Sequence, residues 1–273
     1  MLNKLVTPNP EQDRIDILDH GYVRLVEHMG NDMSIVRSAR VSYDAVPRND
    51  GSDEKLLRYL YKNRHTSPFE AVEFQFEVKC PMFIARQWHR HRTWAYNEVS
   101  ARYTELPEEF YVPDESLIGS QNKRNKQQRD VGQMSDDGSF EFITCGLMKE
   151  HGEKAFESYN AMLREGVPRE LARTILPVST YTRFFAKADL HNLLHFLRLR
   201  LHPHAQIEIQ AYAQGLLDLI TPIVPLTANI FLEGMAEQQR NEEILRIVKE
   251  HLDDTKMSED DLQGYLWDAL RNL

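Results

Sequence analysis

Residues 83–102, FIARQWHRHRTWAYNEVSAR, concentrate side chains suited to an anionic, hydrogen-bonding ligand. The segment holds four arginines against one carboxylate, Glu98, whereas the whole chain has 33 Lys and Arg against 42 Asp and Glu. Arginine is a permanent cation whose planar donor fork fits phosphate, and neutral amides and hydroxyls can recognise the edge of a ring. If residues 81–90 form a helix, Gln87 and Arg90 lie three apart on one face. A solvated basic helix end, paired with some of the many carboxylates, is the alternative.

Histidines on a predicted helix suggest either a metal site or a wall for a flat ligand. His191 and His195 are four residues apart, a spacing that can chelate zinc. The residues between them lack the glutamate base of the His-Glu-x-x-His hydrolases, and no carboxylate or cysteine cluster adds ligands, so we expect no metal. The stripe formed by His191, His195 and Leu199 could instead line an aromatic ligand, or the imidazoles could be half-buried structural groups.

No pattern in the sequence predicts an activated nucleophile or a glycine-rich phosphate loop. Ser100 lies in Glu-Val-Ser-Ala-Arg rather than in a Gly-x-Ser-x-Gly turn, and the 12 glycines form neither a Rossmann nor a Walker pattern. Cys80 and Cys145 form no Cys-x-x-Cys pair, so neither a disulfide framework nor a thiolate zinc site is predicted. Any cofactor phosphate must therefore be bound by arginine and histidine side chains.

Hydrophobic spacing predicts the elements that must position these residues. Apolar and polar residues alternate from Val72 to Val78, which predicts a strand with one buried face. A few strands early in the chain and helices later indicate one α+β domain. We expect short strands at residues 15–18, 22–26 and 181–186; helices from 32, from 52 to before 66, and at 81–90, 147–163, 168–173, 189–201 and 203 to about 220; an exposed loop at 119–140; and two amphipathic pieces after 242.

The order of these residues resembles the flavin-dependent thymidylate synthases. Arg90-His91-Arg92, seven residues and then Ser100 match the Arg-His-Arg-(x)7-Ser signature of that family, which is far more specific than a glycine pattern. The resemblance covers roughly residues 15–220. Further blocks in the same order lie at residues 30–42, 65–70, 87–88, 167–173, 181–185 and 199–206.

The resemblance implies an activity, a fold and an assembly. The expected reaction is reductive methylation of dUMP to dTMP, with methylenetetrahydrofolate as one-carbon donor and NADPH as reductant through FAD. Hydride would pass from reduced flavin to the uracil ring without an enzyme nucleophile. We expect a single α+β domain, with a small, mostly antiparallel sheet packed against helices, in a homotetramer whose active sites lie between subunits. Its parts would be an N-terminal extension (1–14), the synthase domain (15–232) with a loop insertion (119–140), and an acidic helical C-terminal extension (233–273).

The resemblance also implies roles for individual residues. His65 would lie beside the flavin and help the folate or the proton transfers, and it joins Arg200, Arg173 and Ser100 as the expected catalytic residues. The residues expected to bind dUMP are Gln87, Arg90, Glu98, Ser100, Arg102, Arg173 and Arg200. Those expected to contact FAD are Ser42, Ser67, Glu70, Arg90, His91, Arg92, Asp189, His191, His195, Leu199 and His204. In the insertion, Lys123, Arg124, Lys126 and Arg129 are expected to be solvated, the alternative being contact with a folate glutamate tail.

Composition excludes several other classes of protein. The net charge of −9 argues against coating of nucleic acid, and no run approaches the roughly 18 apolar residues of a membrane helix. We expect a cytoplasmic protein with neither nucleic acid nor membrane as partner. Two rival hypotheses keep the basic segment but change its use: an RNA-binding module that stacks bases on Trp88, Trp94 and Tyr96, and a flavin reductase with another substrate.

Overall fold

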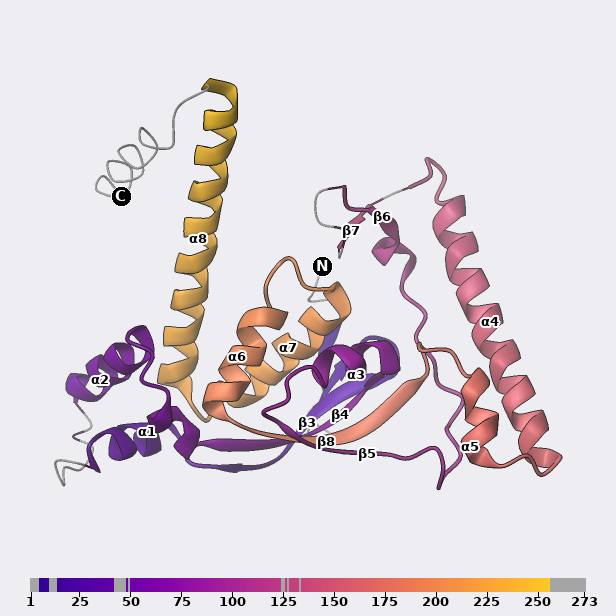
Figure 1. Ribbon diagram of the computed structural model, residues 1–273, viewed down its shortest axis with the longest axis horizontal. Coiled ribbons are helices and arrows are strands. Elements are labelled where there is room, and N and C mark those ends of the chain that lie inside the picture. The colour runs from indigo at the N-terminus through magenta and orange to yellow at the C-terminus, as the bar shows by residue number, and fades with distance from the viewer. Residues whose placement is uncertain are drawn as a thin grey trace. The chain divides into compact units, whose positions relative to one another are not determined.

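An antiparallel sheet of six strands organises residues 1–226, the first of two units into which the chain divides. The computed structural model describes residues 5–9, 14–41, 48, 50–123, 126, 128–132 and 134–255, with side chains up to residue 246. The strand order is β1-β2-β3-β4-β8-β5 (Figure 1). The strands are β1 (Val6–Asn9), β2 (Arg14–Ile17), β3 (Gly21–Met29), β4 (Glu73–Pro81), β5 (Ala95–Glu98) and β8 (Tyr181–Asp189).

Helices cover one face of this sheet. Figure 1 shows α3 (Met82–Trp88), α6 (Leu190–Arg200) and α7 (Ile207–Ile220) on the same side of the strands. The other helices of this unit are α1 (Asp32–Ala39), α2 (Gly51–Lys62), α4 (Ser139–Arg164) and α5 (Arg169–Ala172), with short 3-10 turns η4 (Ser67–Ala71), η5 (Glu115–Leu117) and η6 (Arg173–Ile175). Helix α8 (Pro225–Thr255) enters the second unit, residues 227–273.

The core lies between the sheet and these helices. Phe74, Phe76 and Val78 alternate along β4 and are almost fully buried, which confirms the strand expected from the sequence. Trp88 of α3 is the largest side chain in this layer; its ring centroid lies 5.5 Å from that of Phe184 on β8 and 4.7 Å from that of Phe196 on α6. One indole therefore fixes the end of α3, just before Arg90-His91-Arg92, to both the sheet and α6.

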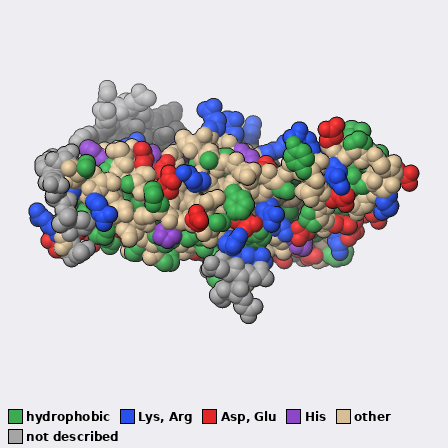
Figure 2. Space-filling model, turned by 90° about the horizontal axis from the view of Figure 1, so that it is seen from below, with side chains coloured by type: hydrophobic (Ala, Val, Ile, Leu, Met, Phe, Trp, Pro, Cys, Tyr) green, Lys and Arg blue, Asp and Glu red, His purple; other side chains and the backbone are tan. Residues whose placement is uncertain are grey.

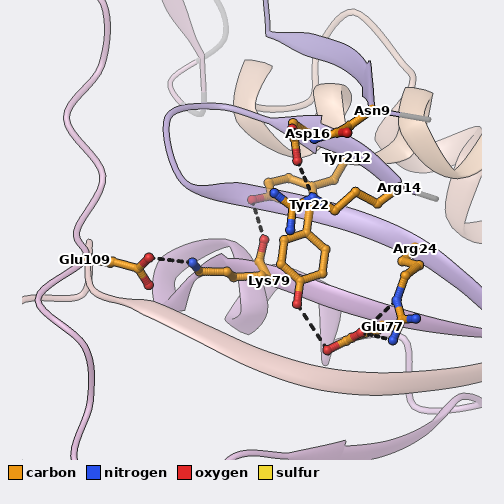
Figure 3. A network of polar contacts seen from close by, with 9 residues as sticks. All are labelled: Asn9, Arg14, Asp16, Tyr22, Arg24, Glu77, Lys79, Glu109 and Tyr212. Carbon is orange, nitrogen blue, oxygen red and sulfur yellow. Dashed lines mark hydrogen bonds and ion pairs between the residues drawn. The ribbon is translucent and has the colours of Figure 1, made fainter. Parts of the chain in front are cut away.

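The opposite face of the sheet is polar. Figure 2 views it, with Lys and Arg interspersed with Asp and Glu. Glu77 on β4 accepts hydrogen bonds from Tyr22 Oη (3.1 Å) and Arg24 Nε (3.0 Å), and Lys79 Nζ lies 2.7 Å from Glu109 Oε1 (Figure 3). Burial raises the pKa of Glu77, but the hydrogen bonds from Arg24 and Tyr22 outweigh it and hold this pKa below its ordinary value.

The expected α+β architecture with an antiparallel sheet is confirmed, and several boundaries are corrected. The exposed loop expected at 119–140 is wrong in part, because strands β6 (Gly119–Gln121) and β7 (Arg129–Val131) pair as a hairpin and α4 already begins at Ser139. Strand β5 was not expected, and β8 runs to Asp189. Helix α7 begins at Ile207 rather than at Pro203.

The chain termini also differ in detail from the expectation. Strand β1 lies within the expected N-terminal extension and pairs with β2 at the edge of the sheet. The expected domain boundary at residue 232 falls inside α8, which also contains the start of the first amphipathic piece. The second amphipathic piece, after Ser258, lies outside the described residues. Over the described part of the chain, no helix combines the length and apolar character needed to cross a membrane.

Gly21 allows α7 to approach the sheet, which predicts a sensitive position. A Cβ there would lie 1.9 Å from Tyr212 Oη and 2.7 Å from the carbonyl oxygen of Ile17, while Tyr212 donates to the carbonyl of Lys79 at 2.8 Å (Figure 3). We expect Gly21→Ala to lower the free energy of unfolding by about 1–3 kcal/mol through overpacking. Gly51→Ala, whose Cβ meets nothing within 4 Å, is the control. Urea denaturation measures both; equal midpoints would contradict the packing argument.

Candidate active site

Arg200, at the end of α6, connects the basic segment to the helical layer. Its Nε donates to His91 Nε2 at 3.2 Å and its Nη2 donates to the carbonyl oxygen of Gln87 at 3.1 Å. The Gln87 side chain in turn donates from Nε2 to Gln206 Oε1 at 2.6 Å. Three residues expected at the site, Gln87, His91 and Arg200, are thus in direct contact, although more than 100 positions separate Arg200 from the other two. We refer to these three residues as the Arg200 cluster.

The protonation state of His91 determines whether it can accept the hydrogen bond from Arg200. His91 is 7% exposed, and its ring lies edge-on to Phe196 with centroids 4.8 Å apart. Burial, together with the charges of Arg200 and His195, lowers the pKa of His91 from 6.5 to about 4. A neutral imidazole has one acceptor nitrogen, so near neutral pH His91 Nε2 can accept the Arg200 hydrogen bond.

Tyr96 holds the Arg-His-Arg turn that follows α3. Its hydroxyl contacts the carbonyl oxygens of Trp88 (3.2 Å) and His91 (3.0 Å), and burial raises its pKa, so it remains a neutral donor. Arg90 and Arg92 leave this turn as exposed side chains, and neither forms a hydrogen bond or ion pair with another described residue. The turn therefore presents the guanidinium groups of Arg90 and Arg92 to solvent, while the Tyr96 hydroxyl binds its backbone.

A cavity of about 190 Å³ lies beside this turn, between the end of α2, η4 and α6. It brings together three histidines that were expected at the flavin: His65, His191 and His195. Burial first, and then the neighbouring His191, Arg198 and Arg200, lowers the pKa of His195, so this imidazole is neutral near pH 7. Arg64 and Arg198, which also line the cavity, carry permanent positive charge there.

These two arginines, Arg64 and Arg198, were not expected at the site from the sequence. Arg198 Nη2 donates to Tyr61 Oη at 2.7 Å. Arg64 adopts φ of +56°, the left-handed conformation that ends α2 and turns the chain into His65. Arg198 lies three residues after His195 on one helix face, and this spacing was a signal in the sequence that could have found it.

Residues of the second half of the signature lie along β5 and the turn after it. Glu98 Oε1 accepts from Thr182 Oγ1 at 2.6 Å, which ties this carboxylate to β8. Ser100 Oγ accepts from the backbone N–H of Arg102 at 3.4 Å, and the Arg102 guanidinium lies 5.3 Å from the ring centroid of Tyr103. Among the described residues, no carboxylate or imidazole contacts the Ser100 hydroxyl.

The other residues expected to bind dUMP or FAD do not all lie near the Arg200 cluster or the cavity. Asp189 accepts from the backbone N–H (2.9 Å) and side chain (2.6 Å) of Asn192 and so caps α6 at the start of the helix expected from residue 189. Arg173 begins η6 next to α5, which Figure 1 shows well away from α6, so one chain does not join it to Arg200. Ser67, Glu70, Leu199 and His204 are exposed, and Ser42 lies outside the described residues.

The structure also shows where the cations of the 119–140 insertion lie and whether the described residues could bind a metal. Arg129 is not simply solvated as expected, because it pairs with the buried Glu208 at 2.7 Å. Lys126 lines a cavity of about 450 Å³ together with Arg129 and Gln206. Lys123 is exposed, and Arg124 lies outside the described residues. Within the described ranges, no group of three or more His, Cys, Asp or Glu side chains could hold a metal ion.

Comparison with known proteins agrees with this combination of fold and site. The family model described as thymidylate synthase complementing protein matches residues 24–226, a range that contains the Arg-His-Arg turn and Arg200. The chain belongs to this family.

Individual relatives cover most of the chain. It is 47% identical over 223 residues to a flavin-dependent thymidylate synthase of Thermus thermophilus, covering 82% of this chain and 80% of the relative. It is 43% identical over 234 residues to that of Ehrlichia ruminantium Gardel, covering 85% and 78%. A crystal structure of the UMP/dUMP methylase PolB from Streptomyces cacaoi with 5-Br dUMP aligns at a TM-score of 0.71 and 36% identity, covering 79% of this chain and 96% of PolB.

The low pKa of His91 predicts a pH dependence of stability. Between pH 6.5 and about 4, the unfolded chain binds a proton that the folded chain excludes, so the free energy of unfolding falls as the pH falls through this window. His91→Gln, which cannot titrate, should show a shallower decline than the wild type. Urea denaturation at several pH values measures the slopes. His151→Gln on the exposed part of α4 is the control and should follow the wild type; parallel slopes for all three proteins would contradict the assignment.

Proposed function

We propose that this protein forms dTMP from dUMP by reductive methylation, with methylenetetrahydrofolate as one-carbon donor and NADPH as reductant through bound FAD. The observation that carries the proposal is the Arg200 cluster, in which Gln87, His91 and Arg200 meet at positions that match the family's motifs. The names of the relatives and the brominated nucleotides bound to PolB support a uracil nucleotide as substrate.

In this proposal the nucleotide is held by the dUMP-binding residues expected from the sequence. The exposed guanidinium groups of Arg90 and Arg102 bind the dianionic phosphate, since arginine can meet two phosphate oxygens at once. Arg173 and Arg200 lie at the uracil and stabilise the negative charge that develops on its carbonyl oxygens as the ring is reduced. Gln87, Glu98 and Ser100 complete the pocket through neutral or charge-assisted hydrogen bonds.

The cavity of His65, His191 and His195 fits part of a flavin dinucleotide. It combines aromatic and aliphatic walls with two cations, Arg64 and Arg198, which suits a ligand that has both flat rings and phosphates. When bound, FAD supplies the hydride chemistry of the reaction. The protein's own residues would orient the ligand there: the imidazoles of His65, His191 and His195 would line the rings, and the guanidinium groups of Arg64 and Arg198 would balance the phosphates.

The protein contributes no nucleophile to the uracil ring in this mechanism. Ser100 has no base within reach among the described residues, and a serine hydroxyl needs one to attack. Cys80 is the stronger nucleophile by type, but it is fully buried in β4, and burial raises its pKa well above the ordinary value. Direct reduction of the ring, with Arg173 and Arg200 as electrostatic partners, is the mechanism consistent with these environments.

A homotetramer with shared sites accounts for two features of the single chain. Arg173 lies beside α5, away from the Arg200 cluster, so it reaches a nucleotide at that cluster only from another chain. Helix α4 also exposes large apolar side chains that a monomer would leave in water: Phe142 is 67% exposed and Leu147 62%. In the proposed tetramer this surface is buried between subunits, and Arg173 of one chain meets Arg200 of another.

Product formation tests the proposed activity directly. Purified, flavin-containing protein supplied with dUMP, methylenetetrahydrofolate and NADPH should form dTMP in proportion to the NADPH consumed, because the methyl group requires both a carbon and a hydride donor. Chromatography of the quenched reaction measures dTMP, and UMP replaces dUMP in a parallel reaction. NADPH oxidation without any dTMP would support the rival flavin reductase, and methylation of UMP alone would assign the substrate to the ribonucleotide.

Sharing of the site between chains predicts complementation of two inactive variants. Arg173→Ala and Arg200→Ala should each abolish most activity alone, because each removes a charge at the nucleotide. When the two variants are co-expressed in equal amounts, random assembly leaves about a quarter of the sites with both arginines, so about a quarter of the wild-type rate should return. Light scattering establishes the oligomeric state of each sample. If Arg173 and Arg200 act within one chain, the mixed protein will remain as inactive as its parents.

A further inference from the structure

The hairpin β6–β7 is attached to the first turn of α7 by a buried ion pair. Arg129 Nη2 lies 2.7 Å from Glu208 Oε1, and the Glu208 side chain is only 1% exposed. The same oxygen accepts a hydrogen bond from Tyr111 Oη at 3.1 Å. Glu208 is the second residue of α7, where a carboxylate is favoured by the helix dipole. A surface hairpin is therefore coupled to a charge that could not be left buried without a partner.

A second contact connects the hairpin to residues 201–206, the turn that joins α6 to α7. Gln128 Nε2 donates to the carbonyl oxygen of Pro203 at 2.9 Å, and Gln210 Nε2 donates to that of Ala205 at 2.7 Å. Carbonyl groups in such a turn lack partners from regular secondary structure, and these side-chain amides supply hydrogen bonds to two of them. The hairpin thus contacts both the turn itself and the helix that follows it.

This turn ends at Gln206, which contacts the proposed nucleotide site. Gln206 precedes α7 by one residue and Glu208 by two, and its Oε1 accepts the hydrogen bond from Gln87 Nε2 at 2.6 Å. This bond commits one N–H of Gln87 and so fixes the plane of its amide. The backbone carbonyl of Gln87 is also bound by Arg200. A displacement of residues 201–206 would therefore be transmitted to two members of the Arg200 cluster.

We propose that Arg129 is a positioning residue for the nucleotide site, acting through Glu208 and the 201–206 turn on Gln87. The β6–β7 hairpin then serves as a brace that sets the affinity for the nucleotide. This inference rests on the proposed function for the identity of the nucleotide, dUMP. It assigns no direct contact with substrate to the hairpin.

The test compares Arg129→Ala with Lys123→Ala, which removes an exposed cation from the same hairpin and serves as the matched control. Misalignment of one neutral hydrogen bond should raise KM for dUMP by about three- to tenfold, with kcat within about twofold of wild type. Arg129→Lys, which retains the cation opposite Glu208, should restore most of the affinity. Steady-state kinetics with varied dUMP provide the KM and kcat values, and the flavin content of each protein provides a check on folding.

Several outcomes would overturn the brace. They are an Arg129→Ala protein with the KM of Lys123→Ala, or one whose kcat and thermal stability fall while KM does not change. If Arg129→Ala does not fold, Gln128→Ala decides: it removes the side-chain hydrogen bond to Pro203 and keeps the Arg129–Glu208 pair, and an unchanged KM again overturns the inference. If the wild type forms no dTMP, the proposed function has failed instead. The same variants are then compared by calorimetric binding of dUMP, where equal affinities for Arg129→Ala and Lys123→Ala overturn the brace.

Discussion

The site depends on a hydrogen bond between a guanidinium group and an imidazole that must be uncharged. Arg200 can donate to His91 only while His91 Nε2 carries a lone pair, and burial against Phe196 keeps it so at neutral pH. The surrounding structure maintains that condition. Trp88 fixes α3 beneath the turn, Tyr96 binds the backbone of the turn, and α6 supplies both Phe196 and Arg200. A charged His91 would lie 3.2 Å from the Arg200 guanidinium, and the two cations would repel. The packing that buries His91 is therefore also required for the site to form.

Sequence predicted those parts of the fold in which one segment carries its own signal. Strand β4 alternates apolar and polar residues along the sequence, and a helix was expected from residue 189, where Asp189 caps α6, so both elements were predicted correctly. Strand β5 was missed because Ala95–Glu98 has no apolar alternation and is a strand only through pairing with β8. The β6–β7 hairpin was missed for a related reason: its polar residues are ordered by contacts such as Arg129 with Glu208, 79 positions away.

Prediction of the site had the same limit. The resemblance pointed to Gln87, His91, Arg200 and His65, and helical spacing pointed to His191 and His195, but only the structure shows which of them meet. Gln206 lies in the matched block 199–206 but was given no role, and Arg198 was overlooked although it lies three residues after His195 on the same helix. They become relevant when α6 and α7 pack beside the basic segment. Arg173 shows the complementary case, in which a matched residue lies apart from its expected partners within a single chain.

Two groups of arginines in this protein differ in how their charge is balanced. Arg40, Arg24 and Arg129 each lie within 2.7 Å of a buried carboxylate, on Asp53, Glu77 and Glu208 respectively, so their charges are balanced when the chain folds. Arg90 and Arg92 project into solvent from a fixed turn, without a hydrogen bond or ion pair to another described residue. In a chain of net charge −9, carboxylates are plentiful, so an arginine held away from them on rigid backbone retains its full attraction for a ligand. Because Arg90 and Arg92 have no internal ion pair among the described residues, a dianionic nucleotide, the proposed substrate, could bind them without first breaking one.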